Sequence, residues 1–387
     1  MTDKDHNPSS THPPIPPTSE DESFARLRLL RSRRVGVSTY KRLLTEHGTA
    51  QNALAALPMV ARAAGVQNYE VCPEGVVLAE LRAGKAAGAR LIMHGTADYP
   101  KPLAELDDAP PFLWVLGNID LLNRPTVSMV GARNASSLGT RMAKALAKGL
   151  GEAGFIVVSG LARGIDAAAH LAALPTGTIA VQAGGIDVMY PAENTQLAHD
   201  IAKSGLRVSE QPMGLQPMAR HFPSRNRIIA GLSRATIVVE AAAKSGSLIT
   251  ARDALDQGRD VLAVPGHPFD ARAAGCNMLI RDGAGLVRNT ADVIEALGKE
   301  CLPASPSPQP ELNLAPAEKQ ATSQRTLRET AALHMQILSR LGPSPIAEDQ
   351  LIRDLKAAPA KVAPALIDLE LEGQVLRQPG GLVSRAG

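Results

Sequence analysis

The feature that most constrains the fold is an alternation of short apolar runs with helical stretches beyond Thr126. The runs are rich in β-branched residues and lack a polar face, which is typical of strands buried on both sides. Alternating strands and helices predict a parallel sheet covered by helices on both faces, a Rossmann-like doubly wound α/β fold. The six predicted strands are residues 126–130, 155–158, 178–181, 206–208, 235–239 and 260–264.

The loops that follow these predicted strands contain most of the residues of chemical interest. In a doubly wound sheet such loops lie together along one edge, where ligands bind. We therefore expect one crevice to gather the cations of these loops and of the basic segment before the fifth strand, namely Arg133, Arg163, Arg225, Arg227 and Lys244.

The stretch from His221 to Ala251 is the most informative part of this pattern. Its loop Lys244-Ser245-Gly246-Ser247 opens onto a predicted helix at 248–257. Free backbone N–H groups and the helix dipole make such a helix start suitable for an anion such as a phosphate. The alternative is an ordinary strand-to-helix loop with a serine cap.

Segments of different character flank the predicted sheet. We expect a disordered polar tail at 1–20, a helical domain at 21–87, the Rossmann-like domain at 88–298, a Pro/Ala/Ser linker at 299–324 and a winged-helix domain at 325–387. The winged-helix prediction rests on three helical stretches followed by a hairpin. Its third helix contains Asp368, Glu370 and Glu372, so it is poorly suited to reading a DNA groove.

The first helical stretch is basic, and Glu22 is its only acid between residues 22 and 42. Val35-Gly36-Val37 between two predicted helices indicates a helix-hairpin-helix turn, which can hold DNA phosphates through backbone N–H groups. A solvated basic helix face is the simpler interpretation, and we favour it from the sequence.

The overall composition narrows the class of protein. With 41 Lys and Arg against 38 Asp and Glu, the net charge of +3 does not by itself indicate a nucleic-acid binder. Aromatic residues make up 3% of the chain, which argues against extended base-stacking platforms. Three widely spaced cysteines, with no signal peptide or membrane span, predict a cytoplasmic protein.

The common nucleotide enzymes do not fit. The loop after the first strand, G-A-R-N-A-S, lacks the dinucleotide-binding glycine spacing, and no P-loop motif is present. Asp166 and His170 would share a helix face, where we expect a structural His–Asp contact rather than a catalytic pair. We expect neither catalysis nor a cofactor or metal.

Several motifs occur together in order: V-G-A-R at 130–133, S-G-L-A-R-G-I-D-A-A-A-H at 159–170, Y-P-A-E-N at 190–194, F-P-S-R-N-R-I-I-A-G-L-S at 222–233, V-E-A-A-A-K-S-G-S-L-I-T-A at 239–251 and V-P-G-H-P at 264–268. Together they closely resemble the DNA-processing protein A (DprA/Smf) family. The resemblance is strong over about residues 90–290.

This resemblance implies a homodimer that binds single-stranded DNA without cleaving it and helps to load the RecA recombinase during natural transformation. It implies an electropositive pocket built from the glycine-rich loops. The candidate residues for DNA or phosphate binding are Gly131, Arg133, Ser159, Gly160, Arg163, Arg225, Asn226, Arg227, Lys244, Ser245, Gly246 and Ser247.

The competing hypothesis is an enzyme related to the nucleotide phosphoribohydrolases, such as the LOG proteins, whose fold is similar. Those enzymes have a P-G-G-x-G-T-x-x-E loop with a catalytic carboxylate. The corresponding loop here reads S-G-S-L-I-T-A-R-D, with Arg252 near the place of the glutamate and Asp253 one residue later. Losing that carboxylate favours binding over catalysis.

Overall fold

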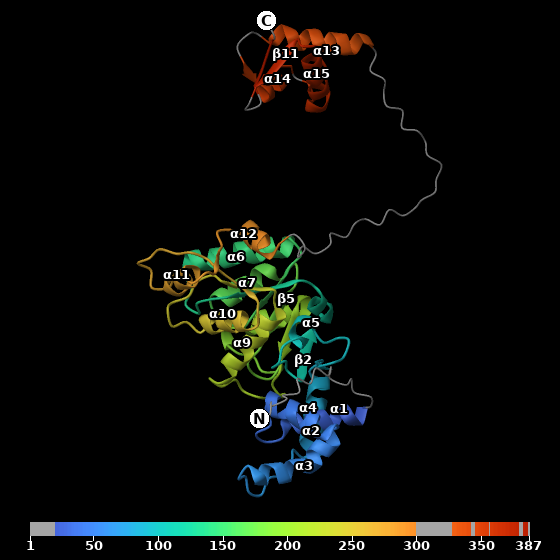
Figure 1. The fold of residues 1–387 in the computed structure, drawn as a ribbon, viewed down its shortest axis with the longest axis vertical. Helices are drawn as coiled ribbons and strands as arrows, with labels where there is room; N and C mark the ends of the chain where they lie inside the picture. Colours follow the sequence, from blue (N-terminus) through green and yellow to red (C-terminus); the bar gives the residue numbers. More distant parts are fainter. Residues whose placement is uncertain (1–19, 299–326, 342–344, 356, 379–381, 386–387) are drawn as a thin grey trace, which may run out of the picture. The chain divides into compact units, whose positions relative to one another are not determined.

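The computed structural model describes residues 20–298, 327–341, 345–355, 357–378 and 382–385. The chain forms two compact units, Met1–Ser307 and Pro308–Gly387 (Figure 1). The predicted linker lies outside the described residues, as does the predicted tail up to residue 19.

A nine-stranded sheet is the centre of the first unit, with the strand order β1-β2-β6-β5-β4-β3-β7-β8-β9. Strands β3 to β9 run parallel to one another, whereas β2 is antiparallel to both of its neighbours, β1 and β6. All six predicted strands are confirmed within one residue at either end. The strands are β1 (Arg90–Met93), β2 (Phe112–Gly117), β3 (Thr126–Val130), β4 (Ile156–Ser159), β5 (Thr178–Val181), β6 (Leu206–Ser209), β7 (Ala235–Val238), β8 (Asp260–Ala263) and β9 (Gly285–Leu286).

Helices cover both faces of this sheet, as the alternation predicts (Figure 1). Helices α6 (Ser137–Glu152), α7 (Ile165–Ala173), α8 (Thr195–Ser204) and α12 (Thr290–Leu297) lie on one face. The other face carries α5 (Lys101–Ala104), α9 (His221–Leu232), α10 (Ser247–Asp256) and α11 (Ala274–Arg281). Two short 3-10 helices, η1 (Ile119–Asn123) and η2 (Ala192–Asn194), occur in the connections.

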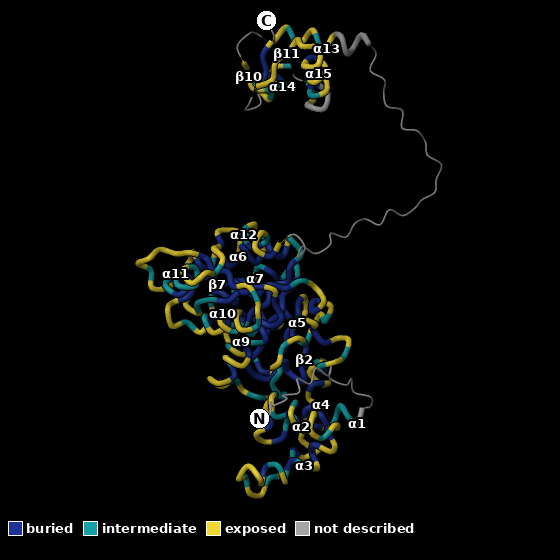
Figure 2. The backbone as a smooth tube through the Cα atoms, in the orientation of Figure 1, coloured by how far each residue is buried: buried dark blue, intermediate teal, exposed yellow. Residues whose placement is uncertain are grey.

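The core is divided by the sheet into two apolar layers, both deeply buried (Figure 2). Side chains alternate along each strand, so Val127 and Met129 pack toward α6 and α7 while Val130 packs toward α9. Every side chain of β3 is buried, which explains why its sequence shows no polar alternation.

The connections between strands diverge beside β3. From β3 the chain proceeds through β4 and β5 to β6 on one side, and it then returns to β7 on the other side. The carboxyl ends of β3 and β7 therefore lie next to each other at a topological switch point. In open α/β sheets this is where a crevice forms between diverging loops.

Four helices precede the sheet: α1 (Glu20–Arg31), α2 (Val37–His47), α3 (Ala50–Ala63) and α4 (Glu74–Ala86). Glu80 of α4 accepts hydrogen bonds from Trp114 Nε1 at 2.8 Å and from Arg31 at 2.7 and 2.8 Å, which joins this domain to β2. The predicted solvated basic face is only partly present: Arg33, Arg34 and Arg42 are exposed, whereas Arg26 and Arg31 are largely buried. Several of the arginines form ion pairs. The pairs are Arg26–Glu22, Arg28–Glu74, Arg31–Glu80 and Arg42–Glu46.

The second unit has the predicted winged-helix pattern. It consists of α13 (Leu327–Arg340), β10 (Ile346–Ala347), α14 (Glu348–Leu355), α15 (Pro359–Leu371), β11 (Val375–Gln378) and β12 (Leu382–Arg385). Strand β12 pairs antiparallel with both β10 and β11. Leu351, Leu366 and Val383 are among the residues of its apolar core.

Candidate nucleic-acid interface

Two adjoining pockets occupy the loops at the carboxyl ends of the parallel strands. We call the smaller one, of about 340 Å³, the inner pocket, and the larger one, of about 780 Å³, the loop pocket. The inner pocket is built around Gly160, Arg163, Gln182, Tyr190 and Glu193. The loop pocket is built around Gly131, Asn226, the 244–247 loop, Thr250 and Arg272. Both pockets are lined by Arg133, Ala162, Phe222 and Arg225.

The loop pocket contains the start of α10. Ser245 Oγ lies 2.7 Å from Ser247 Oγ and accepts a hydrogen bond from the Ser247 backbone N–H at 3.4 Å. Lys244 is exposed beside this turn, and a Cβ added to Gly246 would meet no atom within 4 Å. The helix dipole and the lysine both favour an anion at this end of a ten-residue helix. The geometry thus has the character of a phosphate-binding loop.

Arg225 enters the pockets from α9. Only 6% of the residue is exposed, and Nη1 donates to the backbone oxygen of Val181 at 3.0 Å. Its Nε atom is buried without a hydrogen-bond partner among the described residues. Burial lowers the pKa of Arg225 to about 10, and the charge of Asp166 opposes this effect. Arg225 therefore stays protonated at neutral pH and provides a desolvated positive charge at the wall shared by both pockets.

Asp166, in the first turn of α7, organises the loop after β4. Its Oδ2 accepts N–H groups from Gly160 at 3.1 Å and from Ala162 at 3.4 Å. Burial raises the pKa of Asp166, while Arg225 acts in the opposite direction. The predicted His–Asp contact is wrong, because His170 Nδ1 instead lies 2.8 Å from the hydroxyl oxygen of Thr178. Complete burial lowers the pKa of His170 to about 3, so it serves the core as a neutral side chain.

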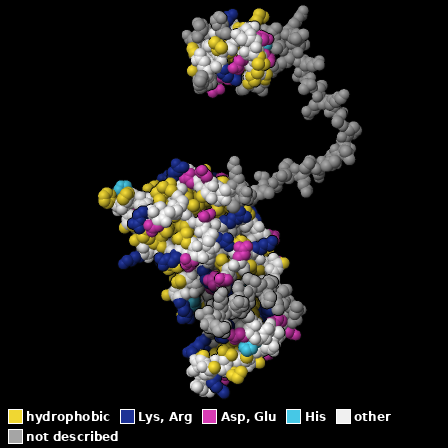
Figure 3. All heavy atoms as spheres, viewed as in Figure 1, with side chains coloured by type: hydrophobic (Ala, Val, Ile, Leu, Met, Phe, Trp, Pro, Cys, Tyr) yellow, Lys and Arg dark blue, Asp and Glu magenta, His cyan; other side chains and the backbone are white. Residues whose placement is uncertain are grey.

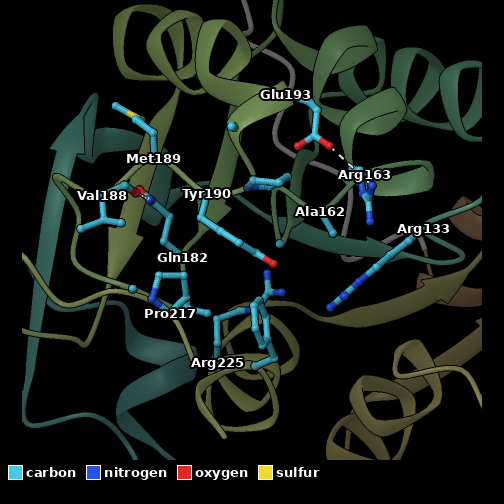
Figure 4. A pocket seen from close by; sticks show the side chains of 16 residues that line it. Arg133, Ala162, Arg163, Gln182, Val188, Met189, Tyr190, Glu193, Pro217 and Arg225 are labelled. Atoms are coloured by element: carbon cyan, nitrogen blue, oxygen red, sulfur yellow. Dashed lines mark hydrogen bonds and ion pairs between the residues drawn. The ribbon is translucent and has the colours of Figure 1, made fainter. Parts of the chain in front are cut away.

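An aromatic pair completes the inner pocket. The rings of Tyr190 and Phe222 lie 5.7 Å apart, and the Arg133 guanidinium carbon is 5.3 Å from the centre of the Phe222 ring. In Figure 4, Tyr190, Arg133 and Arg225 converge on the pocket, and the dashed line joins Arg163 to Glu193, whose closest atoms are 3.5 Å apart. An arginine over an aromatic face forms a cation–π contact, and the ring offers stacking area to a planar ligand.

The structure brings ten of the twelve predicted site residues to the two pockets: Gly131, Arg133, Gly160, Arg163, Arg225, Asn226, Lys244, Ser245, Gly246 and Ser247. Two others are elsewhere. Ser159 is fully buried and donates its hydroxyl to the Met129 backbone oxygen at 2.6 Å. Arg227 lines neither pocket and pairs with Glu210.

Sequence reasoning missed Gln182 and the two aromatic residues of the inner pocket. The overall scarcity of aromatics directed attention away from stacking, although Tyr190 and Phe222 stand at the beginning of the motifs Y-P-A-E-N and F-P-S-R. Their position within ordered motifs was the available signal. Arg272 was also missed, and it lies in the loop pocket 3.5 Å from Glu240.

The carboxylates are placed unfavourably for hydrolysis. Among the residues that line the two pockets, only Asp166 and Glu193 are acidic, and both already have partners. Glu240 accepts hydrogen bonds from the backbone N–H and hydroxyl of Ser136, and Asp253 lines neither pocket. In the described part of the chain, no group of three or more His, Cys, Asp or Glu side chains could hold a metal ion.

The face drawn in Figure 3 has a mixed surface charge. On the face drawn in Figure 3, basic and acidic side chains are interspersed, with no single extended basic patch. In the loop pocket, by contrast, Arg133, Arg225 and Lys244 line one cavity and make it locally positive.

The family of this chain is defined by comparison with known proteins. The family model described as DNA recombination-mediator protein A matches residues 90–298. Models for a DprA-like N-terminal HHH domain and a DprA winged helix domain match residues 20–83 and 306–381. The chain belongs to the DNA recombination-mediator protein A family. This is a family of recombination mediators rather than enzymes, and the phosphoribohydrolase hypothesis is not favoured.

Relatives match over much of the chain. The chain is 38% identical to Protein Smf of Synechocystis over 309 residues, 73% of this chain and 77% of the relative. It is 49% identical to the DNA processing protein DprA of Streptococcus pneumoniae over 198 residues, 51% of this chain and 70% of the relative. The X-ray structure of the pneumococcal protein superposes with a TM-score of 0.59 at 37% identity, covering 70% of this chain and 96% of that one.

A second solved structure bears on the ligand. It concerns the single-stranded DNA binding mode of DNA processing protein A from Helicobacter pylori. That structure superposes with a TM-score of 0.50 at 30% identity, covering 54% of this chain and 95% of that one.

The HHH match supports the helix-hairpin-helix interpretation of the first helices, which the sequence alone had ranked second. No helix in the described ranges is long and apolar enough to cross a bilayer.

Proposed function

We propose that this protein binds single-stranded DNA in the inner and loop pockets. The observation that carries the proposal is the meeting of three elements: the Lys244–Ser247 turn at the start of α10, the buried Arg225, and Arg133 lying over Phe222. The Lys244–Ser247 turn supplies a phosphate site, and Arg133 over Phe222 supplies a stacking surface. Phosphate and base contacts side by side are what a single strand offers and a closed duplex does not.

The pockets also bear on whether binding depends on the base sequence of the strand. The side-chain amide of Gln182 already donates to the Val188 backbone oxygen at 2.9 Å and accepts from Arg207 at 2.8 Å. Stacking and phosphate contacts do not depend on base identity, so we infer binding with little sequence preference. Because several cations contact phosphates, binding weakens as salt rises.

We further propose that the protein acts as a cytoplasmic homodimer that helps to load the RecA recombinase onto incoming strands. Support comes from the family, whose description is that of a recombination mediator. A mediator of this kind needs to hold a strand without consuming it, and the absence of an available carboxylate among the pocket residues is consistent with that role.

One experiment tests the central proposal. The affinity for a labelled oligothymidylate and for the matching duplex is measured by fluorescence anisotropy at several salt concentrations. We expect salt-sensitive binding to the single strand and markedly weaker binding to the duplex. Equal affinity for both forms, or binding that salt does not weaken, would refute the proposed site.

A further inference from the structure

Arg227 was predicted from its motif to contact DNA, but its side chain is committed elsewhere. Nη2 donates to Glu210 Oε2 at 2.5 Å, and Nη1 donates to the backbone oxygen of Asp108 at 2.7 Å. Nε lies 3.5 Å from the Asp108 carboxylate. Only 15% of the Arg227 side chain is exposed, so little of it remains available to a ligand.

Helix geometry separates Arg227 from the pocket residue Arg225. The two residues are two positions apart on α9. With 3.6 residues per turn, their side chains leave the helix about 200° apart. Arg225 reaches both pockets, and Arg227 therefore points to nearly the opposite side. One strand lying in the pockets cannot engage both guanidinium groups from the same side.

The electrostatic surroundings of Arg227 also argue against a DNA contact. Two carboxylates, those of Glu210 and Asp108, lie within 4 Å of its guanidinium. Burial raises the pKa of Glu210, whereas the charge of Arg227 lowers it. Arg227 thus compensates two acids instead of adding positive potential to the pockets.

The contacts of Arg227 tie α9 to three other parts of the fold. Glu210 directly follows β6, and Asp108 belongs to the segment between α5 and β2. Lys41 of α2 donates to the backbone oxygen of Asp107 at 2.5 Å, so the N-terminal helices rest on the same segment. On the α10 side, the Gln257 side chain donates to the Arg227 backbone oxygen at 3.0 Å.

We propose that Arg227 and Glu210 form a positioning clamp that sets the rotation of α9 and thereby holds Arg225 in the pockets. The proposal rests on single-stranded DNA binding at these pockets, as proposed above. It predicts that neutralising Glu210 changes the DNA affinity in the direction opposite to that expected from charge repulsion alone. Removing an acid near a polyanion-binding site should tighten binding, whereas loosening the clamp should weaken it.

The test compares Glu210→Gln and Arg227→Gln with Glu193→Gln, in which an exposed acid of the inner pocket is neutralised. Oligothymidylate affinity is measured across a salt series for each full-length variant, and melting curves confirm that each is folded. We expect both clamp variants to bind about tenfold more weakly, the scale of one lost charge-assisted contact, and to lower the salt slope by the same amount, because both displace the same guanidinium, that of Arg225. Glu193→Gln should bind more tightly than wild type.

Two affinity results would overturn the clamp. Tighter binding by Glu210→Gln would show that its charge acts only as a repulsive term. A salt slope lowered by about 0.7 in Arg227→Gln alone would show that Arg227 contacts a phosphate directly.

Amide hydrogen exchange without DNA separates the clamp from the proposed function. Faster exchange in 221–232 is expected in both clamp variants, with 348–355 of the winged-helix unit unchanged. Unaltered exchange in 221–232 would reject the clamp even if the protein bound no DNA. Failure of the wild type to bind, together with loosened exchange, would reject only the proposed function.

Discussion

Arg225 Nη1 occupies the space that a side chain on Gly160 would need. A Cβ built on Gly160 would lie 1.5 Å from this nitrogen and 2.3 Å from the guanidinium carbon. The two residues are distant in sequence, and the loop after β4 approaches α9 this closely only because Gly160 lacks a side chain. The close approach, rather than an unusual backbone angle, is what requires glycine here.

Gly160→Ala should therefore weaken single-strand binding by displacing Arg225. We expect a loss of about tenfold, comparable to one charge-assisted hydrogen bond, with the overall fold retained. Gly75→Ala in α4 is the matched control, because its added methyl group meets no atom within 4 Å. Anisotropy with oligothymidylate measures both, and wild-type affinity in Gly160→Ala would contradict the placement of Arg225.

Arg133→Ala and Lys244→Ala should each remove one phosphate contact. Each lost contact on a single strand should reduce the slope of log affinity against log salt by about 0.7. Lys148→Ala provides the control, because Lys148 is an exposed lysine of α6 that lines neither pocket. If both pocket variants keep the wild-type affinity and slope, the strand does not lie in these pockets.

Removal of residues 308–387 should leave most single-strand binding in place. The first unit contains the whole nine-stranded sheet and both pockets. In the second unit, α15 contains Asp368 and Glu370, and Glu372 is its C-cap residue. Repulsion between these carboxylates and phosphates makes that helix a poor DNA contact. The truncated protein is compared with the full chain by anisotropy and thermal melting. Near-complete loss of binding by a folded truncation would identify the winged-helix unit as the main DNA contact.

Asp253→Asn should change how stability depends on pH. Burial raises the pKa of Asp253 to about 6, Asp256 and Asp108 add to the shift, and Arg227 and Arg252 oppose it. A raised pKa means that the folded state holds this proton more tightly than the unfolded chain does. Wild-type stability therefore declines as pH rises from about 4 to about 6 because of this group.

Asparagine cannot ionise, so the variant lacks this loss of stability with rising pH. Melting temperatures at pH 4, 5, 6 and 7.5 should show the variant gaining on the wild type between pH 4 and 6, with a constant difference above. A difference that does not change with pH would show that Asp253 titrates normally. The buried Asp253 Oδ2 and Gln257 Oε1 atoms both lack a partner among the described residues. An asparagine amide at position 253 offers a donor in this neighbourhood.

The protein should release no free base from nucleoside monophosphates. N-glycosidic cleavage needs a carboxylate at the reacting centre, but Arg252 stands near the expected position and Asp253 lies outside the pockets. Chromatography of reaction mixtures, with and without divalent metal, provides the measurement. Steady base release that disappears in Glu240→Gln would reverse this conclusion.

The strands and most helices could be predicted because their cause is local. Val127, Met129 and Val130 are apolar on both faces of β3, and only a strand covered on both sides by helices suits such a run. The antiparallel addition of β2 was harder to foresee, since proline-rich sequence precedes it and its partner β6 lies far along the chain. Pairing over such a distance leaves no periodic signal nearby.

The sequence by itself determined which loops reach the edge of the sheet, because strands that alternate with helices run parallel and therefore end at the same edge. It also determined that Lys244–Ser247 begins a helix, where free N–H groups favour an anion. It could not determine where long side chains point. Arg225 and Arg227 look equivalent in the motif, yet the turn of α9 directs one into the pockets and the other to Glu210.

Only the tertiary structure decided which side chains from distant segments become partners. Arginines of the first helix look free in the sequence, but Glu74 and Glu80 of α4 approach Arg28 and Arg31 only after the chain has folded. Likewise, Tyr190 and Phe222 become one aromatic surface because the loop after β5 meets the first turn of α9. Contacts between distant segments depend on packing in three dimensions, and no local pattern encodes them.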